Sequence, residues 1–339
     1  MTTVMITGVS RDLAARFARS LAADPAHTVI GVDVVPPRHD LGRTTFVRAD
    51  IRAPLIATVI ADHAVEVIVH MAVVAAPGRL GGRSSMKEIN VIGTMQLLAA
   101  CQQAESFRKL VVQGSVSVYG AGPRDPARFT EEMGPRSPLR NGFGRDAAEI
   151  ESYVRGLSRR RPDATVTTLR LAPLMGAGVD STITAYLALP VVPKIAGFDA
   201  RLQFLHPTDA VEALLSVVRE DHPGTFNVAA DDVVLLSQAL RRLGRPWLDV
   251  PRPAAPLIAG LARRAGLTDL SEEQLDVLTY GRAMDISRFV EATGWKPRYG
   301  SADALAEWAD LTGPGLLDPA RTGRLVDTAT RWFRGENDD

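Results

Sequence analysis

The chain begins with a pattern typical of a buried strand, a tight turn and an amphipathic helix. Residues 3–8 are mostly apolar or β-branched and end in Gly8, and the helical pattern that follows runs to about Ala23. Units of this kind open parallel α/β folds, in which the N–H groups of the first helix turn can receive a pyrophosphate. The opening residues therefore predict a sheet of parallel strands joined by helices.

The same alternation of strand and helix patterns continues as far as residue 171. We expect strands at 28–33, 44–47, 65–71, 109–114 and 165–171, and helices at 54–63, 84–104 and 143–160. Nearly continuous apolar strands indicate burial on both faces, as in a parallel sheet covered by helices. The expected fold class is α/β, a Rossmann-like doubly wound parallel sheet. Its ligand should lie at the carboxyl ends of the strands, near the switch point between strands one and four.

Prolines interrupt this pattern after Ala172 and suggest a second, smaller unit. We assign 1–173, 203–231 and 286–310 to the sheet domain and 174–202 and 232–285 to a C-terminal substrate-binding lobe. We expect 311–339 to form a C-terminal helical extension.

Composition excludes several classes of function. With 339 residues, 46% of them hydrophobic, the chain can bury a large core. Equal numbers of basic and acidic residues, 39 of each, give no electrostatic footprint for nucleic acid or anionic membranes. No run approaches the ~20 apolar residues that span a bilayer, and a single cysteine, Cys101, suits a reducing compartment. We expect a cytoplasmic protein that acts on a small molecule and holds no metal.

The turn after the first strand departs from the usual dinucleotide-binding pattern. Glycine is preferred at the positions of Arg11 and Ala14, so that phosphates can approach bare backbone. Alanine is tolerated in the second position, whereas Arg11 brings a long side chain to the phosphates. Its guanidinium could bind a phosphate, or the turn could bind nothing. The residues expected at the pyrophosphate are Gly8, Ser10, Arg11, Asp12 and Leu13.

Asp33 closes the second strand, where a carboxylate can accept hydrogen bonds from the adenosine ribose. This favours NAD(H), although the residue could also be a simple turn former. Arg38 lies just beyond and could accommodate a 2′-phosphate, so NADP(H) stays possible as the cofactor. Further candidates for cofactor contacts follow the third and fourth strands: Asp50, Ile51, Met71, Ala72 and Val73.

Later segments add motifs in a specific order. They are Asn-Val-Ile-Gly-Thr at 90–94, Ser-Val-Ser-Val-Tyr-Gly at 115–120, Arg-Leu-Ala-Pro-Leu-Met-Gly at 170–176, Phe-Leu-His-Pro-Thr-Asp at 204–209 and Gly-Trp-Lys-Pro at 294–297. With the opening turn, they resemble the extended short-chain dehydrogenase/reductase family of NAD-dependent sugar epimerases and dehydratases. The resemblance implies cofactor contacts from Asn90, Pro173 and Leu174, and a catalytic Ser115 that polarises a carbonyl. Relatives commonly pair through the helices expected here at 84–104 and 143–160, so a homodimer is possible.

The chemistry departs from that family. Its Tyr-x-x-x-Lys proton donor is replaced by Phe143 and Ala147, and none of the five tyrosines has a lysine four residues later. A substitute proton could come from Ser115 or Ser117 relaying from water, from His206, or from the substrate itself.

A ketone hydrogen-bonded to its own phenol carries such an internal donor, as in an aromatic polyketide. Phe143, Met175 and Phe204 would then line a pocket for a flat substrate. On this interpretation the chain resembles the atypical ketoreductases of actinobacterial antibiotic pathways, of the angucyclinone or simocyclinone type. Two alternatives stay open: a catalytically silent NAD(P)-binding regulator or scaffold, and a sugar-nucleotide epimerase or dehydratase.

Overall fold

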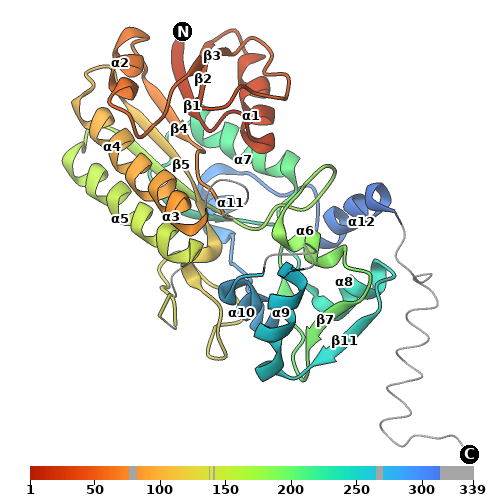
Figure 1. Cartoon of the computed structure of the whole chain (residues 1–339). Coiled ribbons are helices and arrows are strands. Elements are labelled where there is room, and N and C mark those ends of the chain that lie inside the picture. The colour runs from red at the N-terminus through yellow and green to blue at the C-terminus, as the bar shows by residue number, and fades with distance from the viewer. Residues whose placement is uncertain (76–81, 137, 140–141, 265–269, 314–339) are drawn as a thin grey trace, which may run out of the picture.

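A seven-stranded parallel sheet lies at the centre of the molecule. The computed structural model describes residues 1–75, 82–136, 138–139, 142–264 and 270–313 (Figure 1). The strand order is β3-β2-β1-β4-β5-β6-β9, so the direction of winding changes between β1 and β4, as expected. The strands are β1 (Thr2–Thr7), β2 (His27–Asp33), β3 (Thr45–Arg48), β4 (Val67–His70), β5 (Lys109–Ser115), β6 (Thr165–Leu171) and β9 (Gly224–Val228).

Helices cover both faces of this sheet (Figure 1). One apolar cluster joins the sheet to α1 (Asp12–Ala22), α7 (Pro207–Arg219) and α11 (Ser287–Thr293). A second cluster joins the opposite face to α2 (Leu55–Asp62), α4 (Gly93–Gln103) and α5 (Phe143–Arg160). The doubly wound α/β fold predicted from the sequence is therefore confirmed.

A smaller lobe packs below the carboxyl ends of the strands (Figure 1). It has its own apolar cluster and two small sheets, in which β7 pairs with β11 and β8 pairs with β10. Its elements are α6 (Thr182–Leu187), β7 (Val192–Ile195), β8 (Arg201–Leu202), β10 (Val234–Leu235), α8 (Leu236–Arg242), β11 (Trp247–Val250), η3 (Arg252–Ala254), α9 (Ala255–Arg264) and α10 (Glu272–Tyr280).

One segment differs from the domain boundaries expected from the sequence. We assigned residues 286–310 to the sheet domain, but α12 (Ser301–Thr312) buries Leu305 and Trp308 in the cluster of the smaller lobe. The apolar face of α12 packs against the smaller lobe. The periodicity of its sequence predicts an apolar face but does not reveal which part of the molecule covers it. Of the helical extension expected at 311–339, residues 314–339 lie outside the described residues.

The helix expected at 84–104 is interrupted. The structure has α3 (Gly82–Lys87), a π-helical turn η1 (Glu88–Ile92) and then α4. The buried Asn90 lies in this turn, where its Oδ1 accepts the N–H of Val74 at 2.7 Å and its Nδ2 donates to the Val74 carbonyl at 2.9 Å. A π turn of this kind often marks a functional segment, and here it fixes the loop that follows β4.

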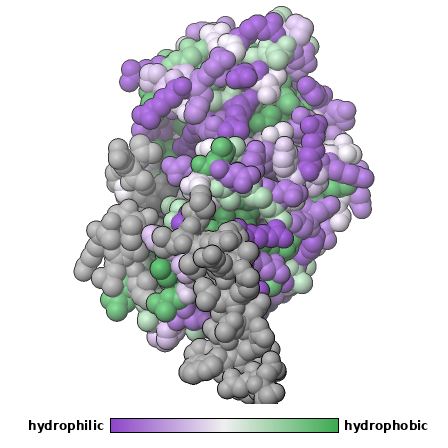
Figure 2. Space-filling view, turned by 90° about the vertical axis from the view of Figure 1, so that its right-hand side faces the viewer, coloured by the Kyte–Doolittle hydropathy of each residue, from purple (hydrophilic) through white to green (hydrophobic). Residues whose placement is uncertain are grey.

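One face of the molecule and the lengths of its helices bear on membrane contact. On the side that carries α1 and α12, hydrophilic residues cover most of the sheet domain (Figure 2). Among the described residues, no helix is both long and apolar enough to cross a bilayer.

His70, the last residue of β4, connects the centre of the sheet to α4. Its ring is fully buried, with Nδ1 2.8 Å from the Thr7 hydroxyl and Nε2 2.9 Å from the Thr94 hydroxyl. The Thr94 hydroxyl donates to the Asn90 carbonyl, so it accepts from Nε2–H and the ring is a neutral acceptor at Nδ1. Burial lowers the pKa of His70 to about 4, with a smaller contribution from the Arg11 charge.

This histidine should make the fold sensitive to mild acid. Between its unfolded pKa of 6.5 and its folded pKa of about 4, only the unfolded chain binds the proton. The free energy of unfolding should therefore fall as the pH decreases through this window, by on the order of 3 kcal/mol in all. Urea unfolding at about pH 7 and about pH 4.5 measures this loss. His70→Gln should lose less than the wild type over the same interval, whereas His63→Gln, at an exposed position, should behave like the wild type. An equal loss of unfolding free energy in the wild type and both variants would contradict the assignment of the acid sensitivity to His70.

Candidate functional site

A cavity of about 520 Å³ lies between the carboxyl ends of the central strands and the smaller lobe. This is the position at which open α/β sheets bind their ligands. Side chains from both parts of the molecule line it, and most of them are apolar. Predicted site residues along its wall are Val73, Ser115, Ser117, Phe143, Pro173, Leu174 and Phe204.

Ser115 ends β5 and begins a 3-10 turn, η2 (Val116–Tyr119). Its Oγ accepts the N–H of Ser117 at 3.1 Å, so the side chain caps this turn. Because the oxygen acts there as an acceptor, the hydroxyl hydrogen stays available for a ligand. The structure thus brings two serine hydroxyls to the cavity and gives one of them a structural task as well.

The N-terminus of α5 places Phe143 at the cavity wall. Ala147 follows one turn later and is buried in the core, so neither residue offers a proton or a charge. A cation nevertheless lies beside this turn. Arg83 from α3 lines the cavity, forms a close ion pair with the buried Asp146 (Nη2–Oδ1 2.6 Å) and donates to the Gly142 carbonyl at 3.0 Å.

Two residues expected in the substrate pocket do not line this cavity. Met175 is fully buried in the apolar cluster of the smaller lobe. His206 is the N-cap of α7, where Nδ1 accepts the N–H of Thr208 at 3.2 Å. Its Nε2 lies 2.5 Å from the Glu307 carboxylate, and its ring stacks on Tyr299. Both ring nitrogens are thus engaged away from the cavity, which the local motif could not show.

The turn after β1 closely approaches the end of β4. Gly8 has φ +76°, and a Cβ there would lie 2.7 Å from the Cα of Ala72. Only glycine is compatible with this approach. The backbone of Asp12 and Leu13 begins α1, so the first N–H groups of that helix face the same region. The backbone arrangement fits the pyrophosphate of a dinucleotide.

The side chain of Arg11 lies across this backbone cradle. It is partly buried and donates a hydrogen bond to the carbonyl of Val73, in the loop after β4. Burial lowers the pKa of this guanidinium, while the Asp33 carboxylate opposes the shift. Arg11 therefore connects the two segments between which a pyrophosphate would have to lie.

Asp33 ends β2 beside the same turn. One carboxylate oxygen accepts the N–H of Ser10 at 3.1 Å and the other accepts the N–H of Val35 at 3.3 Å. The Ser10 hydroxyl in turn donates to the Val35 carbonyl. Asp33 thus joins the two loops that would enclose an adenosine ribose, and Arg38 is exposed in the second of them.

The other predicted cofactor residues lie along the same edge of the sheet. Asp50 forms a close pair with Arg52 (2.7 Å), and these hydrogen bonds lower the pKa of its carboxyl. Ile51 is buried against Gly93. A Cβ added at residue 93 would lie 2.8 Å from the Cδ1 of Ile51. Met71 and Ala72 are buried at the end of β4.

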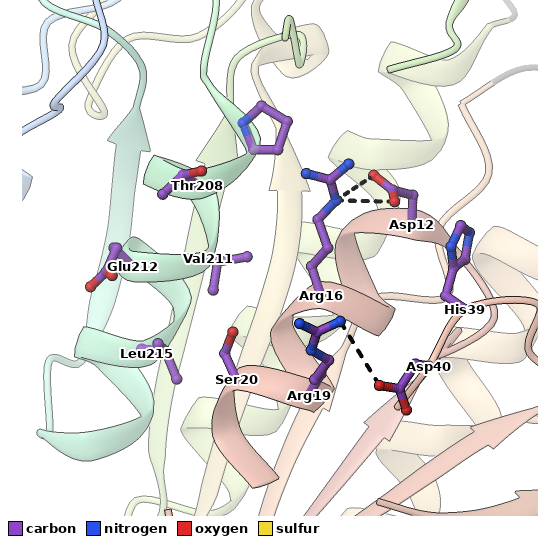
Figure 3. A pocket seen from close by; sticks show the side chains of 11 residues that line it. Asp12, Arg16, Arg19, Ser20, His39, Asp40, Thr208, Val211, Glu212 and Leu215 are labelled. Carbon is purple, nitrogen blue, oxygen red and sulfur yellow. Dashed lines mark hydrogen bonds and ion pairs between the residues drawn. The ribbon is translucent and has the colours of Figure 1, made fainter. Parts of the chain in front are cut away.

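A second hollow, of about 570 Å³, lies between α1 and α7 (Figure 3). Its two guanidinium groups face carboxylates: Arg16 pairs with Asp12 at 2.9 Å, and Arg19 lies 3.9 Å from Asp40. Both pairs are substantially exposed, so their mutual attraction is weak. Neither Ser115 nor Ser117 lines this hollow, so it does not contain the candidate catalytic hydroxyls.

Sequence reasoning missed the charged residues that the smaller lobe brings to the cavity. Glu273 and Arg282 come from α10 and the segment after it, and the sheet domain adds a further missed cation, Arg83 from α3. The Glu273 carboxylate accepts the N–H of Gly144 at 3.1 Å. The pattern Ser-x-x-Gln at 271–274, which caps α10, could have located this helix. No local signal connects it to α5.

The chain resembles known proteins in both sequence and fold. The chain is 43% identical over 341 aligned positions to a Mycobacterium tuberculosis protein named uncharacterized protein Rv0501, covering 97% of this chain and 90% of that protein. A solved structure of UDP-glucose-4-epimerase from Stenotrophomonas maltophila, with bound NAD and formylated UDP-arabinopyranose, has a TM-score of 0.71 at 19% identity and covers 97% of this chain and 100% of that one. The structure of MoeE5 in complex with UDP-glucuronic acid and NAD has a TM-score of 0.72 at 20% identity, with 91% and 98% covered.

These two structures share the fold, and the sequence itself identifies the family. Residues 4–229 match the family described as the NAD dependent epimerase/dehydratase family. The match spans most of the central sheet, and the expected nicotinamide dinucleotide agrees with the family's description. This chain therefore belongs to the NAD dependent epimerase/dehydratase family.

Proposed function

We propose that this protein is an NAD(P)H-dependent ketoreductase that reduces a flat, largely apolar ketone without a tyrosine proton donor. The observation that carries the proposal is the composition of the cavity wall, where the Ser115 and Ser117 hydroxyls lie with the Phe143 side chain in place of a phenol. An aromatic ketone suits such a wall, because the Phe143 side chain can pack on its ring and a serine hydroxyl can polarise its carbonyl.

A nicotinamide dinucleotide, when bound, would supply the hydride. The first N–H groups of α1 would hold its pyrophosphate, and Asp33 would accept hydrogen bonds from its ribose. Pro173 and Leu174, at the cavity wall, would limit the space beside its reactive ring. Arg11 would have to leave the Val73 carbonyl, either to make room or to contact a phosphate.

The contacts of His206 favour the other candidate proton sources. His206 is engaged with Glu307 and Thr208 and does not reach the cavity wall. The serine hydroxyls remain as relays from water, and a phenol on the substrate remains as an internal donor. Loss of a positioned acid costs roughly 10²–10⁴ in rate, which an internal donor can offset.

A sugar-nucleotide epimerase or dehydratase is the second candidate, favoured by structural neighbours that are a dTDP-glucose 4,6-dehydratase and a UDP-glucose-4-epimerase. Such a reaction needs an acid and a base at the sugar. Glu273 is the carboxylate that approaches the α5 N-terminus, and its bond to the Gly144 N–H makes it a poor base in the observed position. Conversion of UDP-glucose to UDP-galactose in the presence of NAD would establish this candidate in place of the reductase.

Arg11 provides a direct test of the cofactor site. Arg11→Gly should bind NADH or NADPH about tenfold more tightly than the wild type, because the dinucleotide no longer has to displace a hydrogen-bonded guanidinium. Enhancement of nicotinamide fluorescence measures the affinity. Arg19→Gln, on an exposed face of the same helix, should leave it unchanged. Weaker binding by Arg11→Gly would show that the guanidinium contacts a phosphate. Failure of both proteins to bind either cofactor at millimolar concentration would leave a silent family member and remove the reductase proposal.

Restoring the family's phenol tests the proton source. Phe143→Tyr, alone and with Ala147→Lys, should raise turnover of an aromatic ketone without an ortho-hydroxyl group by roughly 10²-fold. The gain should be much smaller for a ketone that carries its own ortho-phenol, because that substrate already has a donor. Loss of nicotinamide absorbance measures both rates, and Phe143→Leu controls for altered packing. Equal gains for the two ketones, or no gain for either, would contradict internal proton donation.

A further inference from the structure

Two buried arginines in this chain have opposite electrostatic environments. Arg170 and Arg282 are each 8% exposed. Arg170 forms a bidentate pair with the buried Glu151, at 2.8 and 2.7 Å. The hydrogen bonds and charge of Glu151 outweigh burial there, so the pKa of Arg170 is raised. The pKa of Arg282 is instead lowered to about 10, because burial exceeds the stabilisation from more distant carboxylates.

The contacts of Arg282 explain this difference. Its Nη1 donates to the Gly120 carbonyl at 3.0 Å, and its Nη2 is 3.4 Å from the Ser117 Oγ, a marginal hydrogen bond. Among the residues that the structure describes, no carboxylate lies within ion-pair distance of this guanidinium. A guanidinium has five N–H donors, and these two contacts engage one hydrogen on each of its terminal nitrogens. A buried charge in this state is costly unless an anion joins it.

The position of Arg282 is fixed by its backbone. Gly281 has φ +75°, and a Cβ there would lie 2.2 Å from the backbone nitrogen of Arg201. The N–H of Arg282 donates to the Arg201 carbonyl at 2.9 Å. This close contact holds the residue against the cavity wall, so the guanidinium does not have to be ordered when a ligand enters.

Four other charged groups near Arg282 and the cavity are already engaged, and a fifth, Asp180, is exposed at the cavity wall. Arg83 is paired with Asp146, and Arg201 donates to the Ala127 carbonyl at 3.0 Å. Glu273 accepts the Gly144 N–H, and Asp125 accepts the Gly122 N–H at 2.7 Å. Glu273 and Asp125 favour the charged form of Arg282 from a distance, and they would disfavour a ligand group with more than one negative charge.

We infer that Arg282 binds a carboxylate of the substrate, so that the ketone reduced in this cavity is an aromatic acid. A planar monoanion matches the fork of a single guanidinium and its neutral neighbour, the Ser117 hydroxyl. The inference rests on the proposed function, since it takes the cavity to be the substrate site.

Matched aromatic probes test this assignment. The proteins are titrated by calorimetry with 2-naphthoate and with 2-naphthamide, which have the same ring system and differ in charge. The wild type should bind the carboxylate about tenfold or more tightly than the amide, the effect of one charge-assisted hydrogen-bonded contact. Arg282→Gln should lose this preference and keep its affinity for the amide. Arg282→Lys, which keeps the charge but not the fork, should retain part of the preference.

Arg288→Gln serves as the matched control, because Arg288 is exposed and pairs with Glu132; it should behave like the wild type. Thermal unfolding of each variant establishes that it is folded. Equal affinities of the wild type for the two probes, failure of both to bind, or a preference that survives in Arg282→Gln would overturn the inference. Stronger competition by inorganic phosphate than by acetate would overturn the assignment to a carboxylate.

Titration with NADH or NADPH distinguishes a failure of the anion-site inference from a failure of the reductase proposal. If NADH binds but the charge preference is absent, the anion site is wrong and the reductase proposal stands. If the preference is present but neither cofactor binds, the cavity holds an anion and the reductase proposal fails.

Discussion

The close approach of the first strand's turn to the end of β4 is the constraint on which the site depends. Gly8 and Ala72 are so near that a side chain at residue 8 has no room. His70 strengthens the same junction, because its ring joins the hydroxyls of Thr7 and Thr94 in the protein interior. The junction places the N-terminus of α1 beside the loop after β4, and Asn90 fixes that loop through the backbone of Val74. The backbone arrangement by itself therefore fits the pyrophosphate of a dinucleotide.

The Arg11 side chain changes both the charge and the open space at this helix N-terminus. A glycine in its place would leave the helix N-terminus open, whereas the arginine carries a cation into the gap and bonds it to the Val73 carbonyl. Arg282, which lines the cavity, is a second buried cation, and no carboxylate among the described residues lies within ion-pair distance of it. We propose that both guanidinium groups meet anions, Arg11 a pyrophosphate and Arg282 a carboxylate. The loss of the catalytic tyrosine and lysine is thus accompanied by positive charge at other points of the site.

The regular elements of the sheet domain could be predicted because their signals are local. Strand β6 and helix α5 have the expected bounds, and the other strands that were expected differ by one or two residues at their ends. Repeating apolar runs and helical periodicity carry this information within each segment. The π turn around Asn90 was not expected, because it depends on a hydrogen bond to a distant loop. The packing of α12 was missed for the same reason, since its partner is another lobe.

The sequence by itself determined the fold class, the glycine turn, Asp33 at the end of β2, and the absence of a tyrosine–lysine pair. Each is a property of residue identity at a short spacing. Only the tertiary structure decided that Phe143 meets Ser115 and Ser117 in one cavity, that His206 turns away toward Glu307, and that Arg282 is buried beside Ser117. These facts depend on how segments far apart in the chain pack together, and side-chain burial and charge pairing exist only after that packing.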